Sequence, residues 1–471
     1  VPSREGLREA CLTDTPRYEG EPILAVAAVD EETAAAAIEA IEIDFEPLPF
    51  VVDPLDSLRP DGPNAYVDGN QFSGQDGWSD LKWTDSDFAT IDGGGMPNPS
   101  CPVEWTKGDP ESAFAESALV LEETIVHQSL SHHPMEPRSN MAYWEGETLH
   151  AFVSTQSSQQ TKFALAGALQ IDPENINLVS EYCGGGFGSK IAGTTVMQIP
   201  ALFSRKIDRP VMLRITRYEE NYVGRARPGF QSWLKMGFLE NGKCNAIDLI
   251  IVQESGPYGA GDFNTAGMIA DLTYTPQNMH FRGVSMYTNT PPKAAQRGPG
   301  GAQIISMMEP ILEKAARELG IDRFEMHRLN APGADVEFGP RNATLTSVHA
   351  VEALEQGREM FDWDAKLAMS GQRNGSKVTG IGIGLSPYTA GSRGRDGMML
   401  IRPDGKLYVH QGIGNLGTHS IADTARPAAE LLGYDWEDVE IVWGNSARAY
   451  PRSTVQAGSQ TTTAHTRANH A

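Results

Sequence analysis

The chain has 471 residues, of which 40% are hydrophobic and 21% are charged, which is enough for roughly two to four domains with apolar cores. Its formal net charge of −23 argues against nucleic-acid binding, because a phosphate backbone would repel such a surface. No segment is long and apolar enough to cross a membrane, so no membrane span is expected.

The order of the predicted elements indicates a mixed α/β (α+β) protein in four parts. Residues 1–55 combine a strand at 23–29, a helix at 31–41 and a further stretch at 41–49 into a small α+β unit. Residues 56–105 are rich in Gly, Pro, Asp and Ser, which is typical of a linker. Two larger parts follow, at 106–330 and 331–471.

Strands and helices alternate in both of these parts. The first part contains predicted strands at 119–127, 148–154, 176–182, 210–215, 232–239 and 246–254, and predicted helices at 159–169 and 303–319. The second contains predicted helices at 347–361 and 419–432, and predicted strands at 378–385, 397–402, 406–411 and 439–443.

Three segments have the composition of anion-binding loops. Residues 184–190, Gly-Gly-Gly-Phe-Gly-Ser-Lys, follow a predicted strand, and glycines allow backbone N–H groups to approach a ligand closely. Residues 297–303, Arg-Gly-Pro-Gly-Gly-Ala-Gln, lead into a helix whose N-terminus attracts anions, and Arg297 adds a bidentate donor. Residues 458–463, Gly-Ser-Gln-Thr-Thr-Thr, offer hydroxyls that suit phosphate or pterin oxygens. Each has an alternative interpretation as an ordinary turn, loop or Ser/Thr-rich terminus.

A fourth glycine pattern, Gly412 to Gly417, has the Gly-x-Gly-x-x-Gly spacing of a dinucleotide-binding turn between a strand and a helix. The next strand, however, ends in Val442-Trp443-Gly444-Asn445, with no acid to hold the ribose hydroxyls. An NAD-dependent dehydrogenase is therefore the alternative interpretation. Adjacent His132 and His133 would point to opposite faces of a strand, so no metal site is expected there.

Taken in order along the chain, these motifs resemble the molybdenum hydroxylases, the family of the xanthine dehydrogenases and aldehyde oxidoreductases. The segments that carry the resemblance are Tyr18–Pro22, Ile41–Pro49, Gly108–Pro110, His133–Arg138, Ser154–Gln156, Gly184–Lys190, Arg297–Gly301, Gly412–Thr418 and Arg452–Asn469. The resemblance implies that 1–55 is the C-terminal part of an α/β hammerhead domain. It further implies that 106–330 and 331–471 are two parts of a molybdopterin-binding domain, the second incomplete.

The resemblance also implies the roles of individual residues. Gln156 matches a glutamine whose amide bonds to an oxo ligand of molybdenum, and the metal is held by the pterin dithiolene, without a protein ligand. The implied cofactor-binding residues are Gln156, Gly185, Gly186, Phe187, Gly188, Arg297, Leu416, Gly417, Thr418, Thr461, Thr462 and Thr463. Leu416-Gly417-Thr418 departs from the family's Met-Gly-Gln turn, which puts one amide contact in doubt. The implied cofactor is molybdopterin with molybdenum, in the cytosine dinucleotide form.

The substrate pocket departs from that of xanthine dehydrogenases. Ile191 stands where they carry a glutamate, and the region 264–268 lacks their arginine. A purine would leave polar ring groups unpaired there, so a more apolar pocket lined by Phe187, Ile191, Pro299 and Tyr388 is expected. No Tyr-Arg-Cys loop is present, which argues against carbon monoxide oxidation.

The implied function is oxidation of a small organic molecule, an aromatic heterocycle, aldehyde or aryl compound, with water as the oxygen source. Electrons would pass to an iron–sulfur subunit and an FAD subunit. The family's catalytic glutamate lies in a C-terminal Gly-Glu segment outside this chain, so either a second molybdenum-subunit chain supplies it or this chain is a fragment. A non-catalytic scaffold is a further alternative.

The distribution of the cysteines agrees with iron–sulfur clusters that are bound by partner chains and not by this chain. Cys11, Cys101, Cys183 and Cys244 are scattered without a Cys-x-x-Cys pair, which argues against an iron–sulfur or zinc site in this chain. Such a distribution predicts reduced thiols in the cytoplasm, with two disulfides and a periplasmic location as the alternative.

Overall fold

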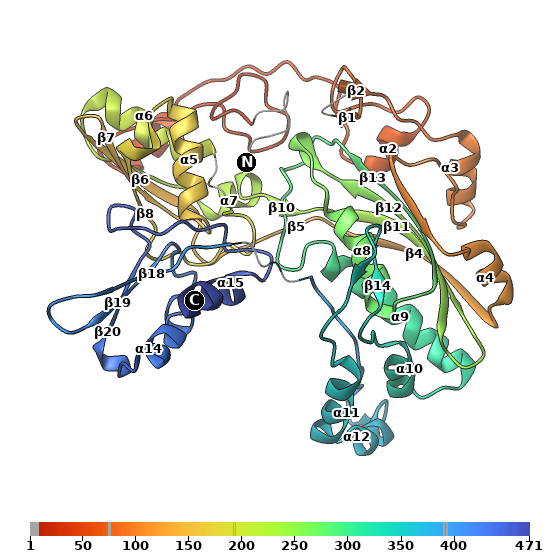
Figure 1. Ribbon diagram of the computed structural model, residues 1–471. Helices are drawn as coiled ribbons and strands as arrows, with labels where there is room; N and C mark the ends of the chain where they lie inside the picture. The colour runs from red at the N-terminus through yellow and green to blue at the C-terminus, as the bar shows by residue number, and fades with distance from the viewer. Residues whose placement is uncertain (1–8, 74–76, 192, 194, 390, 392–393) are drawn as a thin grey trace.

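The computed structural model describes residues 9–73, 77–191, 193, 195–389, 391 and 394–471. The fold is mixed α/β, as predicted, and Figure 1 shows two lobes that the N-terminal segment joins across the top of the view. One lobe contains a five-stranded sheet, and the other contains a four-stranded and a three-stranded sheet. In the part of the chain that the structure describes, no helix is long and apolar enough to cross a membrane.

The five-stranded sheet has the order β3 (Val103–Lys107), β13 (Asn278–Met286), β12 (Cys244–Glu254), β11 (Phe230–Phe238) and β4 (Leu119–His127). Its strands pair antiparallel, except that β12 and β13 run parallel. Successive side chains of a strand point to opposite faces, so the long apolar run of β12 contributes to two cores. Leu249 and Ile251 belong to one core, and Ile250 and Val252 belong to the other.

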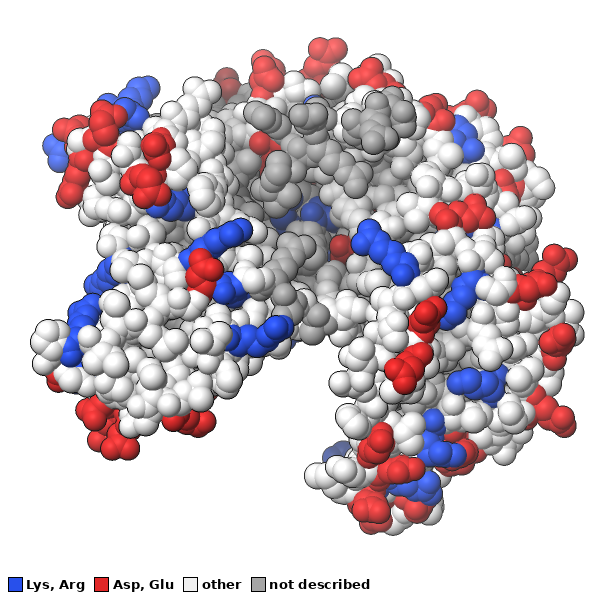
Figure 2. Space-filling view, viewed as in Figure 1, with Lys and Arg blue, Asp and Glu red and all other residues white. Residues whose placement is uncertain are grey.

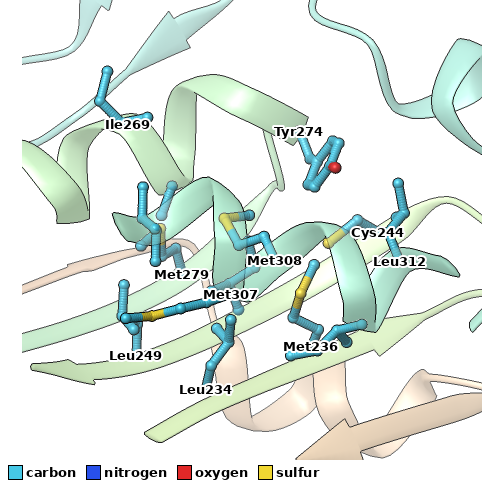
Figure 3. Packing of buried hydrophobic residues seen from close by; sticks show 14 of the residues in the cluster. Leu234, Met236, Cys244, Leu249, Ile269, Tyr274, Met279, Met307, Met308 and Leu312 are labelled. Carbon is cyan, nitrogen blue, oxygen red and sulfur yellow. The ribbon is translucent and has the colours of Figure 1, made fainter. Parts of the chain in front are cut away.

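The first of these cores lies between the sheet and a layer of helices, α8 (Asp262–Tyr274), α9 (Gly301–Leu319) and α10 (Arg323–Asn330). We call it the apolar core. Figure 3 shows the side chains of Met279, Met307 and Met308 packed among aliphatic residues there. Apolar residues recur along α9 at helical spacing, which gives the helix one face to bury.

The segment 56–105, which its composition predicts to be a linker, packs instead against the other face of the sheet. It contains α2 (Pro54–Leu58), β1 (Gln71–Ser73), β2 (Gly77–Ser79) and α3 (Asp85–Asp92). Leu58, Trp83 and Phe88 are buried in the second core against β-strand residues such as Trp233. A few large apolar side chains are enough to anchor the segment on the sheet. Its glycines and prolines therefore belong to turns between packed elements and not to a free linker.

The other lobe carries two smaller sheets. The four-stranded sheet has the order β8 (Ile176–Val179), β7 (Thr148–Val153), β6 (Ser139–Glu145) and β9 (Val211–Arg214), and packs with α5 (Ser158–Leu169) and α6 (Gln198–Ile207). The three-stranded sheet has the order β18 (Met398–Ile401), β19 (Leu407–Gln411) and β20 (Val439–Trp443), with α13 (Ser420–Asp423), α14 (Arg426–Leu432) and α15 (Thr461–His470) beside it.

The remaining elements are short or peripheral. They are α1 (Glu31–Glu39), α4 (Pro110–Glu116), β5 (Leu130–Ser131), α7 (Arg217–Val223), β10 (Ala226–Arg227), β14 (Glu337–Phe338), β15 (Ala343–Thr344), α11 (Ala350–Phe361), α12 (Trp363–Met369), β16 (Arg373–Asn374) and β17 (Lys377–Val378). Helices α11 and α12 extend below the sheet lobe in Figure 1.

Three predicted elements differ from the structure. Residues 23–29 form no strand, since a strand needs a partner for its backbone groups and none of the described residues pairs with them. The further stretch at 41–49 is also irregular. Of the strand predicted at 378–385, only Val378 belongs to a ladder, as the second residue of β17. The helix predicted at 419–432 is split into α13 and α14, because a proline at the start of α14 lacks the N–H that a continuous helix requires.

Candidate cofactor site

A cavity of about 470 Å³ is lined by loops that are far apart in the sequence. Its lining residues are Gln156, Gly185, Gly186, Phe187, Gly188, Ile191, Ala295, Gln296, Arg297, Gly298, Pro299, Tyr388, Leu416, Thr418, Ser420, Asp423, Gln456, Ala457, Gly458, Ser459, Thr461 and Thr462. Every residue that the sequence indicated for the cofactor or the substrate is among them, except Gly417 and Thr463. Figure 2 shows acidic side chains over the outer surfaces of both lobes and several Lys and Arg side chains beside the hollow between them.

The glycines of the first loop are required by close approaches of the chain. A Cβ on Gly186 would overlap the side-chain amide of Gln156, and a Cβ on Gly188 would overlap the carbonyl oxygen of Ala295. The φ of Gly188 is +118°, a conformation open to glycine but not to other residues. Phe187 lies between them with a φ of 54°. The two glycines therefore allow the loop to pass close to Gln156 and Ala295, where it forms one wall of the cavity.

Gln156 joins the first loop to the tail segment. Its side-chain oxygen accepts hydrogen bonds from the backbone N–H of Gly188, at 2.8 Å, and of Lys190, at 3.2 Å. Its amide nitrogen donates to the carbonyl oxygen of Gln456 at 3.1 Å. These contacts fix the plane of the buried amide at the cavity wall, and the ionised carboxylate of a glutamate could not replace the donor nitrogen.

Buried charged groups support the first loop from behind. The fully buried Lys190 donates to the backbone oxygen of Glu136 at 2.8 Å and to its carboxylate at 3.1 Å. That carboxylate also accepts from the N–H of Gly184 at 2.6 Å. Burial alone would raise the pKa of Glu136, but the charge of Lys190 and the donated hydrogen bonds hold it below its usual value.

A second buried ion pair also supports the first loop. Arg138 and Glu220 are both almost completely buried and are 3.0 Å apart. The guanidinium of Arg138 also donates to the carbonyl oxygens of Ser189, at 3.3 Å, and Gly224, at 3.0 Å. The segment His133–Arg138, singled out by its resemblance, therefore acts as a support of the loop, and His132 beside it is a buried residue whose pKa burial lowers to about 4.

The second glycine loop is held against the first. The N–H of Arg297 donates to the carbonyl oxygen of Phe187 at 2.8 Å, and the Arg297 guanidinium lies 4.8 Å from the centroid of the Phe187 ring. Just behind the loop, α9 begins at Gly301. A Cβ on Gly300 would overlap the backbone of Asp262, which explains the glycine at the start of this helix.

Arg227 positions the second loop, and the sequence patterns did not reveal it. The buried guanidinium donates to Gln296 at 2.7 Å, to the carbonyl oxygen of Arg297 at 2.7 Å, to that of Gly298 at 3.2 Å, and to Gln303 at 2.8 Å. Burial lowers its pKa, and no carboxylate among the described residues accepts a hydrogen bond from it. No periodicity or motif distinguishes such a residue from a surface arginine.

The Gly-x-Gly-x-x-Gly turn is explained by backbone packing. It does follow β19 and lead through α13 and α14 to β20, which pairs parallel with β19. A Cβ on Gly412 would overlap the carbonyl oxygen of Pro451, and a Cβ on Gly414 would overlap that of Ser180. Leu416 and Thr418 reach the cavity, whereas Gly417 has a φ of 84° and turns the chain beside it.

The tail completes the cavity. Helix α15 begins at Thr461, and both Thr461 and Thr462 line the cavity at its N-terminal end. Thr463 lies in the same turn but is not part of the lining. The N-terminal end of this ten-residue helix carries the two threonine hydroxyls, and both the helix end and the hydroxyls favour a bound anion. Asp423 supplies the only carboxylate side chain among the described lining residues, and Arg297 the only cationic one.

No group of three or more His, Cys, Asp or Glu side chains among the described residues is arranged to hold a metal ion. The four cysteines are all free.

Comparison with known proteins identifies the family. A family model described as a molybdopterin cofactor-binding domain matches residues 95–331, which is half of the chain, and a second model with the same description matches residues 356–471.

Two curated relatives cover much of the chain. The aldehyde oxidoreductase molybdenum-binding subunit of Escherichia coli O157:H7 is 30% identical over 355 residues, 74% of this chain and 47% of the relative. The xanthine dehydrogenase molybdenum-binding subunit of the same organism is 24% identical over 448 residues, 93% of this chain and 56% of the relative. The chain thus spans about half the length of these relatives.

Solved structures show the same fold. The aldehyde oxidoreductase from Desulfovibrio gigas superposes with a TM-score of 0.76 at 20% identity, covering 99% of this chain and 52% of that chain. Quinoline 2-oxidoreductase from Pseudomonas putida 86 gives a TM-score of 0.76 at 19% identity, covering 98% and 58%. The chain therefore belongs to the molybdopterin cofactor-binding family, to which the molybdenum-binding subunits of aldehyde oxidoreductases and xanthine dehydrogenases also belong.

Proposed function

We propose that this chain holds molybdopterin in the cavity between the first, second and tail loops, as part of a molybdenum hydroxylase. The observation that carries the proposal is the convergence of Gln156, Arg297, two glycine-shaped loops and the start of α15 on one cavity. When bound, the cofactor supplies the two-electron oxidation of a substrate carbon, with oxygen taken from water. By the resemblance, the pterin dithiolene would hold the molybdenum, and no side chain of this chain would need to be a ligand.

The residues present fit such a group. Molybdopterin is a flat polar ring system with a phosphate, and the cavity offers an arginine, hydroxyls and a helix N-terminus for the anionic part. Side chains on Gly186 or Gly188 would push apart the walls that border it. The residues assigned to the cofactor are Gln156, Gly185, Gly186, Phe187, Gly188, Arg297, Leu416, Gly417, Thr418, Thr461, Thr462 and Thr463, with Gly417 and Thr463 shaping the turns behind the lining.

The chain's own side chains orient the substrate. Phe187, Ile191, Pro299 and Tyr388 line one part of the cavity and present rings and a branched alkyl group, which suit a flat aromatic or aldehyde substrate. Their apolar surface also excludes water from the carbon to be oxidised. The amide of Gln156, locked by three hydrogen bonds, fixes the cofactor's orientation relative to this pocket.

The proposal extends to the parts that act with this chain. By its resemblance to the family, the general base would be a glutamate supplied from outside this chain, for which a second molybdenum-subunit chain is one source. Iron–sulfur clusters and FAD on partner chains carry the electrons away, and the cofactor is in the cytosine dinucleotide form. We assign residues 1–55 to the end of a hammerhead domain, and 106–330 and 331–471 to the two parts of the cofactor-binding domain. The four free cysteines favour a cytoplasmic location.

The test is the composition of the purified full chain together with the chains that copurify with it. We expect molybdenum by mass spectrometry, a fluorescent pterin after oxidation, and cytidine monophosphate after acid hydrolysis. Gly188→Val should lower molybdenum and pterin content at least about tenfold, which corresponds to only about 1.4 kcal/mol of binding free energy.

The matched control is Gly357→Ala on α11, where an added Cβ meets no neighbouring atom, so cofactor content should stay unchanged. A preparation without molybdenum and pterin, from cells that load another molybdenum enzyme, would contradict the proposal. Retention of the cofactor by Gly188→Val would place its binding elsewhere.

A further inference from the structure

A second cavity of about 280 Å³ adjoins the cofactor cavity. Gly188, Ile191 and Ala295 line both cavities, so the wall beside the proposed substrate pocket is shared. The other lining residues are Glu9, Ser189, Gly193, Arg225, Tyr258, Gly259, Ala260, Gly261, Asp262, Lys293 and Ala294. A substrate ring beside Ile191 therefore has a polar chamber as its neighbour.

Most charged groups of this chamber are already paired within the protein. Arg225 forms an ion pair with Glu9, and the hydroxyl of Tyr258 donates to Glu21. The buried Lys293 lies 2.5 Å from the carboxylate of Glu254, which is outside the lining. The charges of Arg225 and Lys293 are therefore already neutralised by carboxylates of the protein.

Asp262 is the exception. Asp262 lines the chamber and is only 8% exposed, and its buried Oδ2 has no hydrogen-bond partner among the described residues. Arg227, whose charge acts on it, is occupied by the second loop. A buried carboxylate oxygen without a donor is costly, and proteins rarely leave one without a use.

The position of Asp262 connects the two cavities. Its backbone packs against Gly300, at the start of the helix that follows the second loop. Burial raises the pKa of Tyr388, which lines the cofactor cavity, and the negative charge of Asp262 raises it further. The carboxylate thus acts on both sides of the shared wall.

We propose that the second cavity is a substrate subsite in which Asp262 accepts a hydrogen bond from an amino, amidino or ring N–H group of the substrate. This inference rests on the proposed function and adds a substrate class to it: a flat ring with a nitrogen donor at the end remote from the carbon that is oxidised. A site built around a buried acceptor rejects analogues that lack the donor, because the acceptor then stays unpaired.

The test measures binding without turnover. Benzamidine and acetophenone have similar shapes, but only benzamidine carries nitrogen donors. Calorimetry on the purified full chain with its copurifying partners should show tighter binding of benzamidine. Asp262→Asn should weaken benzamidine binding about tenfold or more, as expected for a lost charge-assisted hydrogen bond, and leave acetophenone binding within about twofold. Asp262→Ala should give the same loss, provided that its melting temperature shows a folded protein.

The control is Asp435→Asn, an exposed carboxylate outside both linings, which should change neither affinity. Asp423→Asn tests whether the probe enters the cofactor cavity instead. Equal benzamidine affinity in wild type and Asp262→Asn would overturn the inference. A loss confined to Asp423→Asn would also overturn it, by placing the probe in the cofactor cavity. Molybdenum and pterin are measured in the same samples, so their absence would contradict the proposed function separately from this result.

Discussion

The apolar core and the support of the cofactor loops are both buried, but different forces hold them together. The apolar core consists of aliphatic, aromatic and methionine side chains between the five-stranded sheet and α8, α9 and α10. We call the second region the polar scaffold; it consists of Glu136, Arg138, Lys190, Glu220 and Arg227. Apolar packing is non-directional and tolerates exchange of similar side chains, whereas a buried charge depends on particular partners. The site is therefore the less substitutable part of the molecule.

The largest effect is expected where the polar scaffold loses one partner. Glu220→Ala leaves the Arg138 guanidinium buried without a counter-charge and should lower the free energy of unfolding by about 3–5 kcal/mol. Denaturant unfolding of the purified chain measures this. Replacing both residues, as Arg138→Met with Glu220→Leu, should cost clearly less than Glu220→Ala alone. A single change as mild as the double would contradict the role assigned to the pair.

A cavity in the apolar core should be costly but leave the site intact. Leu249 is completely buried, so Leu249→Ala should lower the free energy of unfolding by about 2–5 kcal/mol through lost contacts and an unfilled volume. Molybdenum content per folded chain should stay at the wild-type value, because Leu249 does not line the cofactor cavity. A parallel loss of molybdenum would show that core and site are coupled, and would break the comparison.

Replacing Asp262 should raise the free energy of unfolding, by less than the two preceding changes lower it. Burial, only partly opposed by the charge of Arg227, raises its pKa from 3.8 to about 6. The folded state then binds the proton more tightly than the unfolded state, so the carboxylate costs stability increasingly as the pH rises from about 4 to 6. Asp262→Asn should therefore raise the free energy of unfolding by about 1–3 kcal/mol at pH 7.5 and by little near pH 4. A gain that does not depend on pH would rule out this explanation.

The smallest effect is expected from a conservative change in the apolar core. Met308→Leu nearly conserves volume in a core rich in flexible methionines, so its cost should stay below about 1.5 kcal/mol. Thermal melting in parallel with Arg227→Lys sharpens the contrast. Lysine keeps the charge but cannot reproduce the four contacts of the guanidinium, so this equally conservative change should cost more and should lower molybdenum content.

Much of the secondary structure was predictable because its cause is local. The strands at 119–127 and 439–443 occur at the predicted residues, and the predicted helix at 159–169 begins one residue earlier. Apolar periodicity and turn residues specify these elements within a few positions. The prediction fails at 23–29 and within 56–105, where the presence or absence of a neighbouring surface decides whether a segment pairs, packs or stays irregular.

The sequence by itself indicated glycine-rich loops that suit a bound anion, because clustered glycines expose backbone N–H groups and cations lie near them. Through the order of motifs along the chain, it also assigned Gln156, Phe187 and Arg297 to one site, and all three line one cavity. Only the tertiary structure decided what holds those loops: Gln156 meets a backbone oxygen 300 residues away, and Arg138 meets a carboxylate 82 residues away. Such partners cannot be read from local patterns, because hydrogen bonds and charge pairs depend on distance in space. For the same reason, Arg227 and Asp262 could not be predicted from the sequence, and only the fold shows that they lie beside the site.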